Sequence, residues 1–369
     1  PKPQAQISGS TRTGQPLAQK KKNNNNNKED DPSSRAHPHR PLPRGGFFLG
    51  ARAACMLPAM GWLIADVGGT NTRCAVARPG GVLERVEAFR NRDYPGLEEL
   101  LGAYLGRLPP DSRPAEAILA IAAPIRGDEI RMVNINWTLS LRQLADRLFL
   151  TRVTPLNDFA AQAYALPVLA PGDLVAVGGG RAIDRAPKVV VGPGTGLGVA
   201  GLVWVGGRWH AVTGEGGHVT LAPSNEREAR LVALGRERFG HCSAERLISG
   251  AGLAFIHSAL TGDAELAPAA VGERIAAGDA AALDALDVFF ELLATVASNL
   301  ALTFAAFGGV YIGGGVTPRY LPQFQASGFR QRFEDKGRYR GFLADIPTFV
   351  ITADQPALKG LAAYAEAGS

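Results

Sequence analysis

The chain has few cysteines and no long hydrophobic run. Only Cys55, Cys74 and Cys242 occur among its 369 residues, and they have neither the spacing of a metal site nor the even number of a disulfide framework. This usage is typical of proteins kept in a reducing compartment. No stretch of the sequence is long and apolar enough to cross a bilayer as a helix. We therefore expect a cytoplasmic protein that has no membrane partner.

Residues 1–59 show little apolar periodicity and include the biased segment KKKNNNNNKEDD. Such a segment cannot bury enough apolar surface to offset the entropy of ordering, so we expect a disordered tail. The tail carries a net charge of +7, which leaves −2 for the rest of a chain whose total is +5. A basic tail could bind nucleic acid or an anionic membrane, but lysines scattered among asparagines are more typical of a solvated spacer. No nucleic-acid partner is expected. Met56 and Met60 lie just before the first predicted strand and favour an over-extended upstream start as the origin of the tail.

The rest of the chain alternates predicted strands and helices in two halves. The first half has strands near 62–67, 73–77, 82–88, 116–124 and 151–157, with helices after Pro95, after Ser140 and at 158–166. The second half has strands near 188–193, 197–205, 310–315 and 347–352, long helices between 225 and 307, and a last helix from Pro356. Because a glycine-rich strand end opens each half, we expect a duplicated architecture.

Neither standard nucleotide-binding fingerprint is present. The sequence has no GxxxxGK[ST], and none of its glycine clusters opens a βαβ unit as GxGxxG does. Glycines instead follow predicted strands in VGGTNT (67–72) and VGPGTGLG (191–198), and bracket one in FGGVYIGGGVTPR (307–319). Glycines let backbone amides approach an anion closely, and threonine hydroxyls add donors, so each cluster can hold a phosphate without a cationic side chain. Each cluster alone is more often a tight hairpin or a bulge. Together, with Asp66 placed to orient hydrated magnesium, they resemble the actin-like ATPase and sugar-kinase superfamily.

An Asn-Asp pair stands between a predicted strand and a predicted helix in PLNDFAAQAYALP (155–167). A short carboxylate at this position, Asp158, could take a proton from a substrate hydroxyl. The alternative is that Asp158 is an ordinary helix cap.

Two glutamates and a histidine lie in otherwise small-residue loops, TGEGGHV (213–219) and SAERLISG (243–250). Ionised carboxylates can accept hydrogen bonds from two sugar hydroxyls at once, a task that suits Glu215 and Glu245. The alternative for Glu245 is the third helical position after a Ser243 cap, and the alternative for His218 is a satisfied core or loop histidine.

Six motifs, in this order, resemble segments of the bacterial glucokinase family: LIADVGGTNTR, LNDFAAQAYALP, VGPGTGLGVAGLV, GEGGHVTLAP, SAERLISGAGL and FGGVYIGGGVTPR. The similarity covers the chain from about Gly61 to its C-terminus. It implies a two-lobed actin-like ATPase (ribonuclease H-like) α/β fold, with a small α/β lobe and a larger α+β lobe around a cleft. The expected domains are a small one at 60–168, completed by the helix 356–369, and a large one at 169–355.

The resemblance also implies ATP-dependent phosphorylation of glucose at its 6-hydroxyl, with magnesium. Asp158 is then the general base, Asn157, Glu215, His218 and Glu245 hold the sugar hydroxyls, and Asn136 in the loop NINW closes over the sugar. The implied nucleotide contacts are Gly68, Gly69, Thr70 and Asn71 in one phosphate loop, Gly194, Thr195 and Gly196 in the other, and Gly313 and Gly314 near adenosine. Asp66 is expected to hold the magnesium ion through water.

Related kinases of the ROK group carry a cysteine cluster that binds zinc together with the histidine. Here Cys242 stands alone next to His241, so no zinc is expected, and His218 should act through hydrogen bonds. The family is commonly dimeric, which predicts a homodimer.

Two other classes of protein share this scaffold. A sugar sensor or transcription regulator would need a DNA-binding module, and the tail has no helix-turn-helix pattern. An actin-like chaperone or filament former would have no use for the carboxylates of the sugar loops. The sequence leaves open how strictly glucose is preferred over mannose or glucosamine, and whether a donor other than ATP is used.

Overall fold

A computed structural model describes residues 61–132 and 135–368, and both of its large sheets belong to one compact unit of the chain. The predictions for the tail at 1–59, including Met56 and Met60, lie outside these residues.

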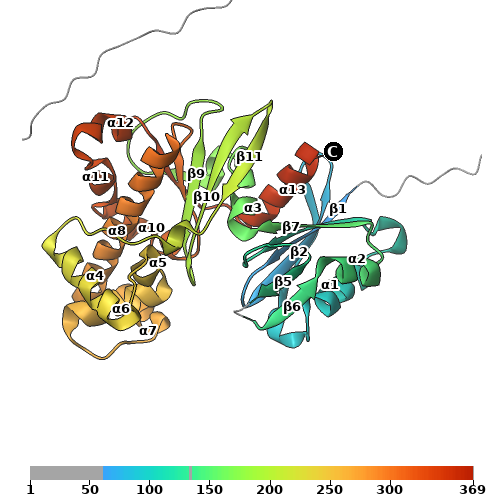
Figure 1. Cartoon of the computed structure of the whole chain (residues 1–369), viewed down its shortest axis with the longest axis horizontal. Helices are drawn as coiled ribbons and strands as arrows, with labels where there is room; N and C mark the ends of the chain where they lie inside the picture. The colour runs from blue at the N-terminus through green and yellow to red at the C-terminus, as the bar shows by residue number, and fades with distance from the viewer. Residues whose placement is uncertain (1–60, 133–134, 369) are drawn as a thin grey trace, which may run out of the picture. The chain divides into compact units, whose positions relative to one another are not determined.

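The first sheet has five strands in the order β3-β2-β1-β4-β7 (Figure 1). An antiparallel meander of three strands is followed by two strands that run parallel to β1. The strands are β1 (Trp62–Val67), β2 (Asn71–Arg78), β3 (Val82–Arg90), β4 (Glu116–Ile121) and β7 (Arg152–Asn157).

Alternating side chains of β1 serve two cores, because successive residues of a strand point to opposite faces. Leu63 and Val67 pack with α1 (Leu97–Gly106) and α2 (Leu141–Leu148) on one face. Ile64 packs with α13 (Pro356–Gly368) on the other. A small hairpin of β5 (Glu129–Met132) and β6 (Trp137–Ser140) joins the first of these cores.

The second sheet repeats the first. Its order is β11-β10-β9-β12-β13-β8, again with a three-stranded antiparallel meander followed by two strands parallel to its first strand. This repetition confirms the expected duplication, with one extra antiparallel edge strand, β8. The strands are β8 (Leu174–Ala176), β9 (Lys188–Pro193), β10 (Leu197–Val205), β11 (Arg208–Thr213), β12 (Val310–Ile312) and β13 (Thr348–Ile351).

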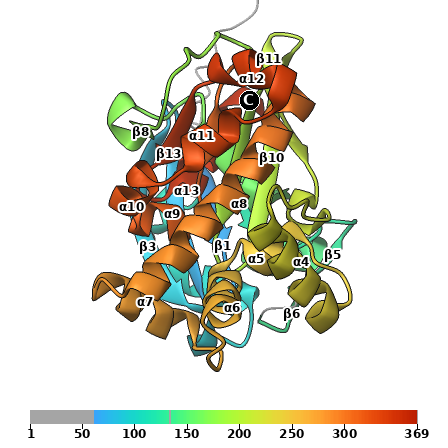
Figure 2. The same ribbon diagram turned by 90° about the vertical axis from the view of Figure 1, so that its left-hand side faces the viewer.

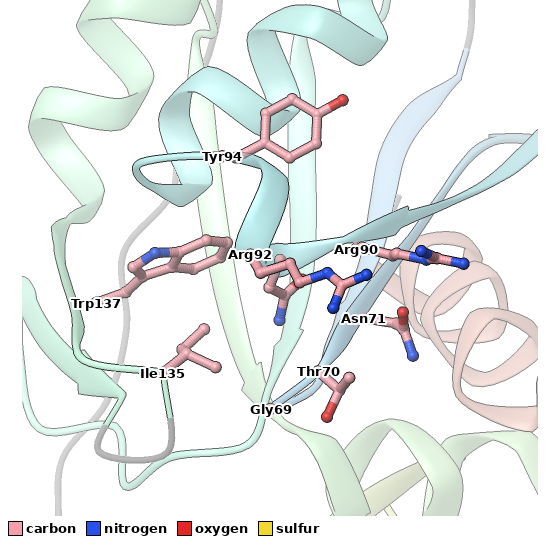
Figure 3. A pocket seen from close by; sticks show the side chains of 9 residues that line it. Gly69, Thr70, Asn71, Arg90, Arg92, Tyr94, Ile135 and Trp137 are labelled. Atoms are coloured by element: carbon pink, nitrogen blue, oxygen red, sulfur yellow. The ribbon is translucent and has the colours of Figure 1, made fainter.

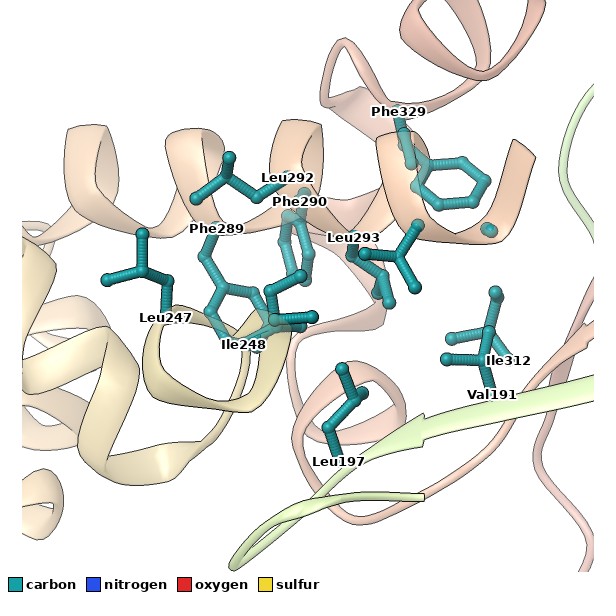
Figure 4. Close-up of a cluster of buried hydrophobic side chains, with 14 of the residues drawn as sticks. Val191, Leu197, Leu247, Ile248, Phe289, Phe290, Leu292, Leu293, Ile312 and Phe329 are labelled. Atoms are coloured by element: carbon teal, nitrogen blue, oxygen red, sulfur yellow. The ribbon is translucent and has the colours of Figure 1, made fainter. Parts of the chain in front are cut away.

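The long helix α8 (Ala280–Phe304) forms the centre of the core beside the second sheet (Figure 2). Its N-terminus is capped by Asp279, whose side chain accepts a hydrogen bond from the backbone N of Ala282 at 2.8 Å. Phe289 and Leu293 lie among aliphatic side chains of the sheet and of the shorter helices (Figure 4). Those helices are α4 (Glu226–Phe239), α5 (Ala244–Leu247), α6 (Gly250–Thr261), α7 (Pro268–Ala276), α9 (Val316–Arg319), α10 (Leu321–Ala326), α11 (Phe329–Glu334) and α12 (Arg340–Ala344).

Two helices are exchanged between the sheets. Helix α3 (Asp158–Ala165) follows β7 of the first sheet, yet its Phe159 and Ala163 pack on β9 and β10 of the second. Helix α13 follows β13 of the second sheet and packs on the first. The two helices lie side by side (Figure 1). A Cβ added to Gly360 would lie 1.7 Å from the carbonyl oxygen of Ala161. The division into domains at 60–168 with 356–369, and at 169–355, stays a prediction.

The boundaries differ from the sequence prediction at a few strands. Strand β12 ends at Ile312, before the predicted end at 315, because the three glycines that follow turn towards α9. The short strands β5, β6 and β8 and the hairpin strand β11 were not predicted.

Candidate active site

The glycine-rich hairpins of both sheets meet at one cavity of about 700 Å³. Most of the predicted site residues line it: Gly68, Gly69, Thr70, Asn157, Asp158, Gly194, Thr195, Gly196, Glu215, His218, Glu245 and Gly314. Four predicted residues do not line it, namely Asp66, Asn71, Asn136 and Gly313.

The first hairpin, between β1 and β2, is held from behind by Asn91. The backbone N of Gly68 donates to the carbonyl oxygen of Asn71 at 3.1 Å, which closes the turn. Asn91 is 3% exposed, and its Nδ2 donates to the carbonyl oxygen of Gly68 at 2.8 Å. Its Oδ1 accepts from the hydroxyl of Thr72 at 2.8 Å. Asn91 therefore fixes the turn while leaving the amides of Gly69 and Thr70 free of any hydrogen bond to its side chain.

The second hairpin, between β9 and β10, is held by Glu245. One carboxylate oxygen of Glu245 accepts from the backbone N of Leu197 at 3.0 Å. A Cβ added to Gly196 would lie 2.4 Å from that same oxygen, so a side chain at this position would displace the carboxylate. Glu245 thus lines the cavity and also shapes its phosphate-loop candidate.

Asn157 caps helix α3 and orients the neighbouring carboxylate. Its Oδ1 accepts from the backbone N of Phe159 at 3.0 Å and of Ala160 at 3.2 Å. Its Nδ2 donates to Oδ1 of Asp158 at 3.0 Å. The interpretation of Asp158 as the helix cap is therefore wrong, because Asn157 is the cap and Asp158 is the first helical residue, facing the cavity.

The environment of Asp158 disfavours its ionised form. Burial raises the pKa of Asp158 to about 6, and the nearby charges of Asp66 and Glu215 add to the effect, while the backbone N–H of Phe159 opposes it. Burial also raises the pKa of Asp66, partly offset by Arg73, whose guanidinium lies 3.9 Å away. A carboxyl group with a pKa near 6 is mostly ionised at neutral pH and still basic enough to accept a proton from a hydroxyl.

His218 stands between two carboxylates on the opposite wall. Its Nε2 is 4.0 Å from Glu215, and its Nδ1 is 3.9 Å from Glu245. With 56% of its side chain exposed, His218 is not a core histidine. Ser243 is at the N-cap position of α5, but its side chain makes no capping hydrogen bond, and Glu245 is the second helical residue, not the third. The capping alternative for Glu245 is therefore wrong. The three side chains form a polar wall suited to hydroxyl groups.

The residues that miss the cavity lie close to it. Asn71 lines an adjoining cavity of about 620 Å³, as do Ile135 and Trp137, the neighbours of Asn136. Asn136 itself has a left-handed backbone with φ of 52°. A Cβ on Gly313 would lie 2.8 Å from the side-chain oxygen of Gln162, so Gly313 backs the site against α3.

Sequence reasoning missed several residues of the cavity wall. Arg131 on β5 is the only arginine or lysine among its described lining residues. The signal was the alternation in EIRM, where Ile130 and Met132 are buried and Arg131 is exposed. Phe159 is a second lining residue that was missed. Its ring packs directly on the second hairpin, since a Cβ on Gly198 would lie 1.8 Å from it.

No helix of the described residues is long and apolar enough to span a membrane. Nor do the described residues bring together three or more His, Cys, Asp or Glu side chains that could hold a metal ion. Any ion bound beside Asp66 would therefore need oxygen ligands from water or from a bound substrate.

Comparison with known proteins gives consistent matches. The profile of the Glucokinase family matches residues 63–368. A glucokinase of Chromobacterium violaceum is 47% identical over 308 residues, which cover 82% of this chain and 88% of that protein. A glucokinase of Ralstonia nicotianae is 46% identical over 320 residues, covering 82% of this chain and 94% of that protein.

Solved structures match as well. The crystal structure of glucokinase from an Antarctic psychrotroph has a TM-score of 0.76 and 31% identity, and the match covers 83% of this chain and 99% of that one. A ROK family glucokinase from Streptomyces griseus, in complex with glucose and AMPPNP, has a TM-score of 0.58 at 18% identity, with coverage of 84% and 100%. At that identity the second match bears on the fold alone.

Proposed function

Because the chain belongs to the glucokinase family, we propose that it transfers the γ-phosphoryl group of ATP to the 6-hydroxyl of D-glucose. The products are glucose 6-phosphate and ADP, and the reaction is the entry step of glycolysis. The fold of the chain is the expected two-lobed actin-like ATPase fold of the glucokinase and ROK sugar kinases. The observation that carries the proposal is the position of Asp158, oriented by Asn157 in a cavity that two glycine-rich hairpins share with a polar wall.

Asp158 is the general base of the proposed reaction. Its carboxylate removes the proton of the 6-hydroxyl as that oxygen attacks the γ-phosphorus, and Asn157 fixes the accepting group. The raised pKa of Asp158 supports this role because it makes the carboxylate a stronger proton acceptor than an exposed aspartate.

We propose that glucose binds against the wall of Glu215, His218 and Glu245. The hydrogen-bond acceptors of these side chains match the hydroxyl groups around the sugar ring. Asn157 contributes to the same sugar site, and Asn136 closes over the sugar from its loop. Mannose and glucosamine differ from glucose only at C2, so discrimination between the three sugars would depend on which side chain of this wall faces that carbon.

We propose that backbone amides of the two hairpins bind the phosphates of ATP. Phosphoryl transfer depends mostly on positioning and charge stabilisation, so rigid hairpins braced by Asn91 and Glu245 suit it. Arg131 adds positive charge to a wall that otherwise carries carboxylates. The predicted contacts are Gly68, Gly69, Thr70 and Asn71, then Gly194, Thr195 and Gly196, with Gly313 and Gly314 near adenosine.

Asp66 is the residue that would hold magnesium, through water. The negative charge of Asp66 contributes to the raised pKa of Asp158, so a cation nearby would favour the ionised form of Asp158. Magnesium commonly binds through one or two carboxylates together with substrate phosphates, and the bound ion neutralises phosphate charge. A homodimer, a cytoplasmic location and the absence of zinc stay predictions.

The proposal is tested by a coupled assay of ADP formation with ATP, magnesium and a panel of glucose, mannose and glucosamine. We expect glucose-dependent turnover and none without sugar. Protein that binds glucose but leaves ATP unconsumed would be a sensor instead. Turnover independent of sugar would indicate an actin-like ATPase.

The rate should rise with pH through the pKa of Asp158. Because that carboxyl acts in its ionised form, kcat/KM for glucose should fall about tenfold per pH unit below about pH 6. Glu215→Gln removes a like charge and should move the midpoint downward. A profile that stays flat from about pH 8 to about pH 5 would contradict the assignment of Asp158 as the base.

Gly196→Ala should weaken sugar binding through Glu245. The new methyl group occupies the place of the carboxylate that accepts from Leu197, and a charge-assisted hydrogen bond of this kind contributes about 1.5–3 kcal/mol. We expect KM for glucose to rise at least about tenfold, measured in the coupled assay. Gly214→Ala is the matched control, since a Cβ there meets nothing within 4 Å on the same cavity wall. Equal KM values for the two variants would refute the role of Glu245.

A further inference from the structure

A second cavity of about 620 Å³ adjoins the active-site cavity (Figure 3). The two cavities share Gly69 and Thr70 of the first hairpin, but Asp158 and the sugar-binding wall line only the first. We call the second cavity the arginine pocket, after Arg90 and Arg92, which line it on either side of Asn91.

The arginine pocket combines positive charge with an apolar wall. In Figure 3, Arg90 and Arg92 gather near Asn71, while Ile135 and Trp137 lie on the opposite side. The guanidinium of Arg92 is 3.8 Å from the carboxylate of Asp93. Because both side chains are mostly exposed, this ion pair is weak and Arg92 stays available to a bound anion. Tyr94 completes the less polar part of the lining.

We propose that the arginine pocket binds a phosphate monoester that has an apolar or ring-shaped body. Two guanidinium groups match the oxygens of a dianionic phosphate, and charge-assisted bonds of this type are the stronger ones in proteins. The body of the ligand lies against Tyr94, Ile135 and Trp137. A free inorganic anion would leave this wall unused.

Binding at the arginine pocket is coupled to the nucleotide site. Asn91 stands between the two arginines and holds the carbonyl oxygen of Gly68, so the ligand acts on the hairpin that we assign to the phosphates of ATP. A bound dianion also cancels two positive charges beside that hairpin and lowers its attraction for ATP. KM for ATP should therefore rise when the ligand binds. This consequence, unlike binding itself, rests on the proposed function.

Phenyl phosphate is the probe, because it joins a dianion to an apolar ring. We expect calorimetric titration of the full chain to show one site, with tighter binding than inorganic phosphate or phenol. The double variant Arg90→Gln/Arg92→Gln should weaken binding at least about tenfold. Arg142→Gln, an exposed arginine of α2 that lines neither cavity, should leave binding unchanged.

Titration in the presence of saturating AMPPNP and glucose separates the two sites. The coupling is supported if phenyl phosphate still binds in the presence of AMPPNP and glucose but with lower affinity. Its affinity should fall by the same factor by which phenyl phosphate lowers the affinity for ATP. Complete mutual exclusion would place the probe in the active-site cavity and overturn the proposal, as would equal affinities of wild type and the double variant. If the chain binds phenyl phosphate but shows no kinase activity, the proposed ligand site is supported and only the proposed function is refuted.

Discussion

Replacement of Asp158 by asparagine is expected to lower kcat about a hundredfold to ten-thousandfold, the usual contribution of a general base. Asparagine keeps the size of the side chain and an oxygen that can accept from Nδ2 of Asn157. Only the capacity to take up a proton is lost. KM for glucose should therefore change little, and the coupled assay over a range of glucose concentrations separates the two constants.

The same variant should be more stable than the wild type at neutral pH. Burial raises the pKa of Asp158 from 3.8 to about 6, so its ionisation costs the folded state up to about 3 kcal/mol once the pH exceeds both values. This cost is present above about pH 6 and disappears below about pH 4. The stability gain of Asp158→Asn should therefore be largest above about pH 6 and absent below about pH 4. Thermal unfolding at both pH values measures the difference.

A fall in kcat together with a rise in melting temperature distinguishes a lost base from a damaged fold. Asp111→Asn is the matched control, because Asp111 is exposed in a short 3-10 helix and does not line the cavity. It should change neither quantity. If Asp158→Asn retained kcat within tenfold of the wild type, proton transfer to this carboxylate would not be part of the rate-limiting step.

The parts of the site that could be predicted have local causes. The glycines that follow β1 and flank the end of β9, and the Asn-Asp pair at the junction of β7 and α3, stand in short motifs whose backbone and side chains act within a few residues. The resemblance added roles to these positions, and the structure brings most of them to one cavity.

The residues that were missed depend on contacts remote in sequence. Asn91 supports Gly68 from 23 positions away, and nothing in its neighbours signals that contact. Asn71 and Gly313 show a second limit, because consecutive residues of a turn face different sides and a motif does not say which. By contrast, the pair Gly206–Gly207, with φ of 60° and 83°, is a hairpin signal that the sequence contains, and it predicts β11 when it is used.

The exchange of α3 and α13 also has no local signal, and it leads to the second large prediction. Gly360→Ala should destabilise the protein by about 3 kcal/mol, the upper end of the range of about 1–3 kcal/mol that overpacking typically costs, because the obstacle is backbone. The added Cβ would lie 1.7 Å from the carbonyl oxygen of Ala161 and 2.8 Å from the backbone N of Ala165. The melting temperature should fall by roughly 5 °C or more.

The control for this change lies on the same helix. A Cβ at Gly368 meets nothing within 4 Å, so Gly368→Ala should shift stability by no more than about 0.5 kcal/mol. Because the obstacle at Gly360 is the backbone of α3, no shorter side chain on α3 can relieve it, and the helices must move apart. Asp158 begins α3, so kcat should fall along with stability in Gly360→Ala, although the variant lies outside the cavity. Equal melting temperatures for the two glycine variants would show that this helix contact does not hold the two sheets together.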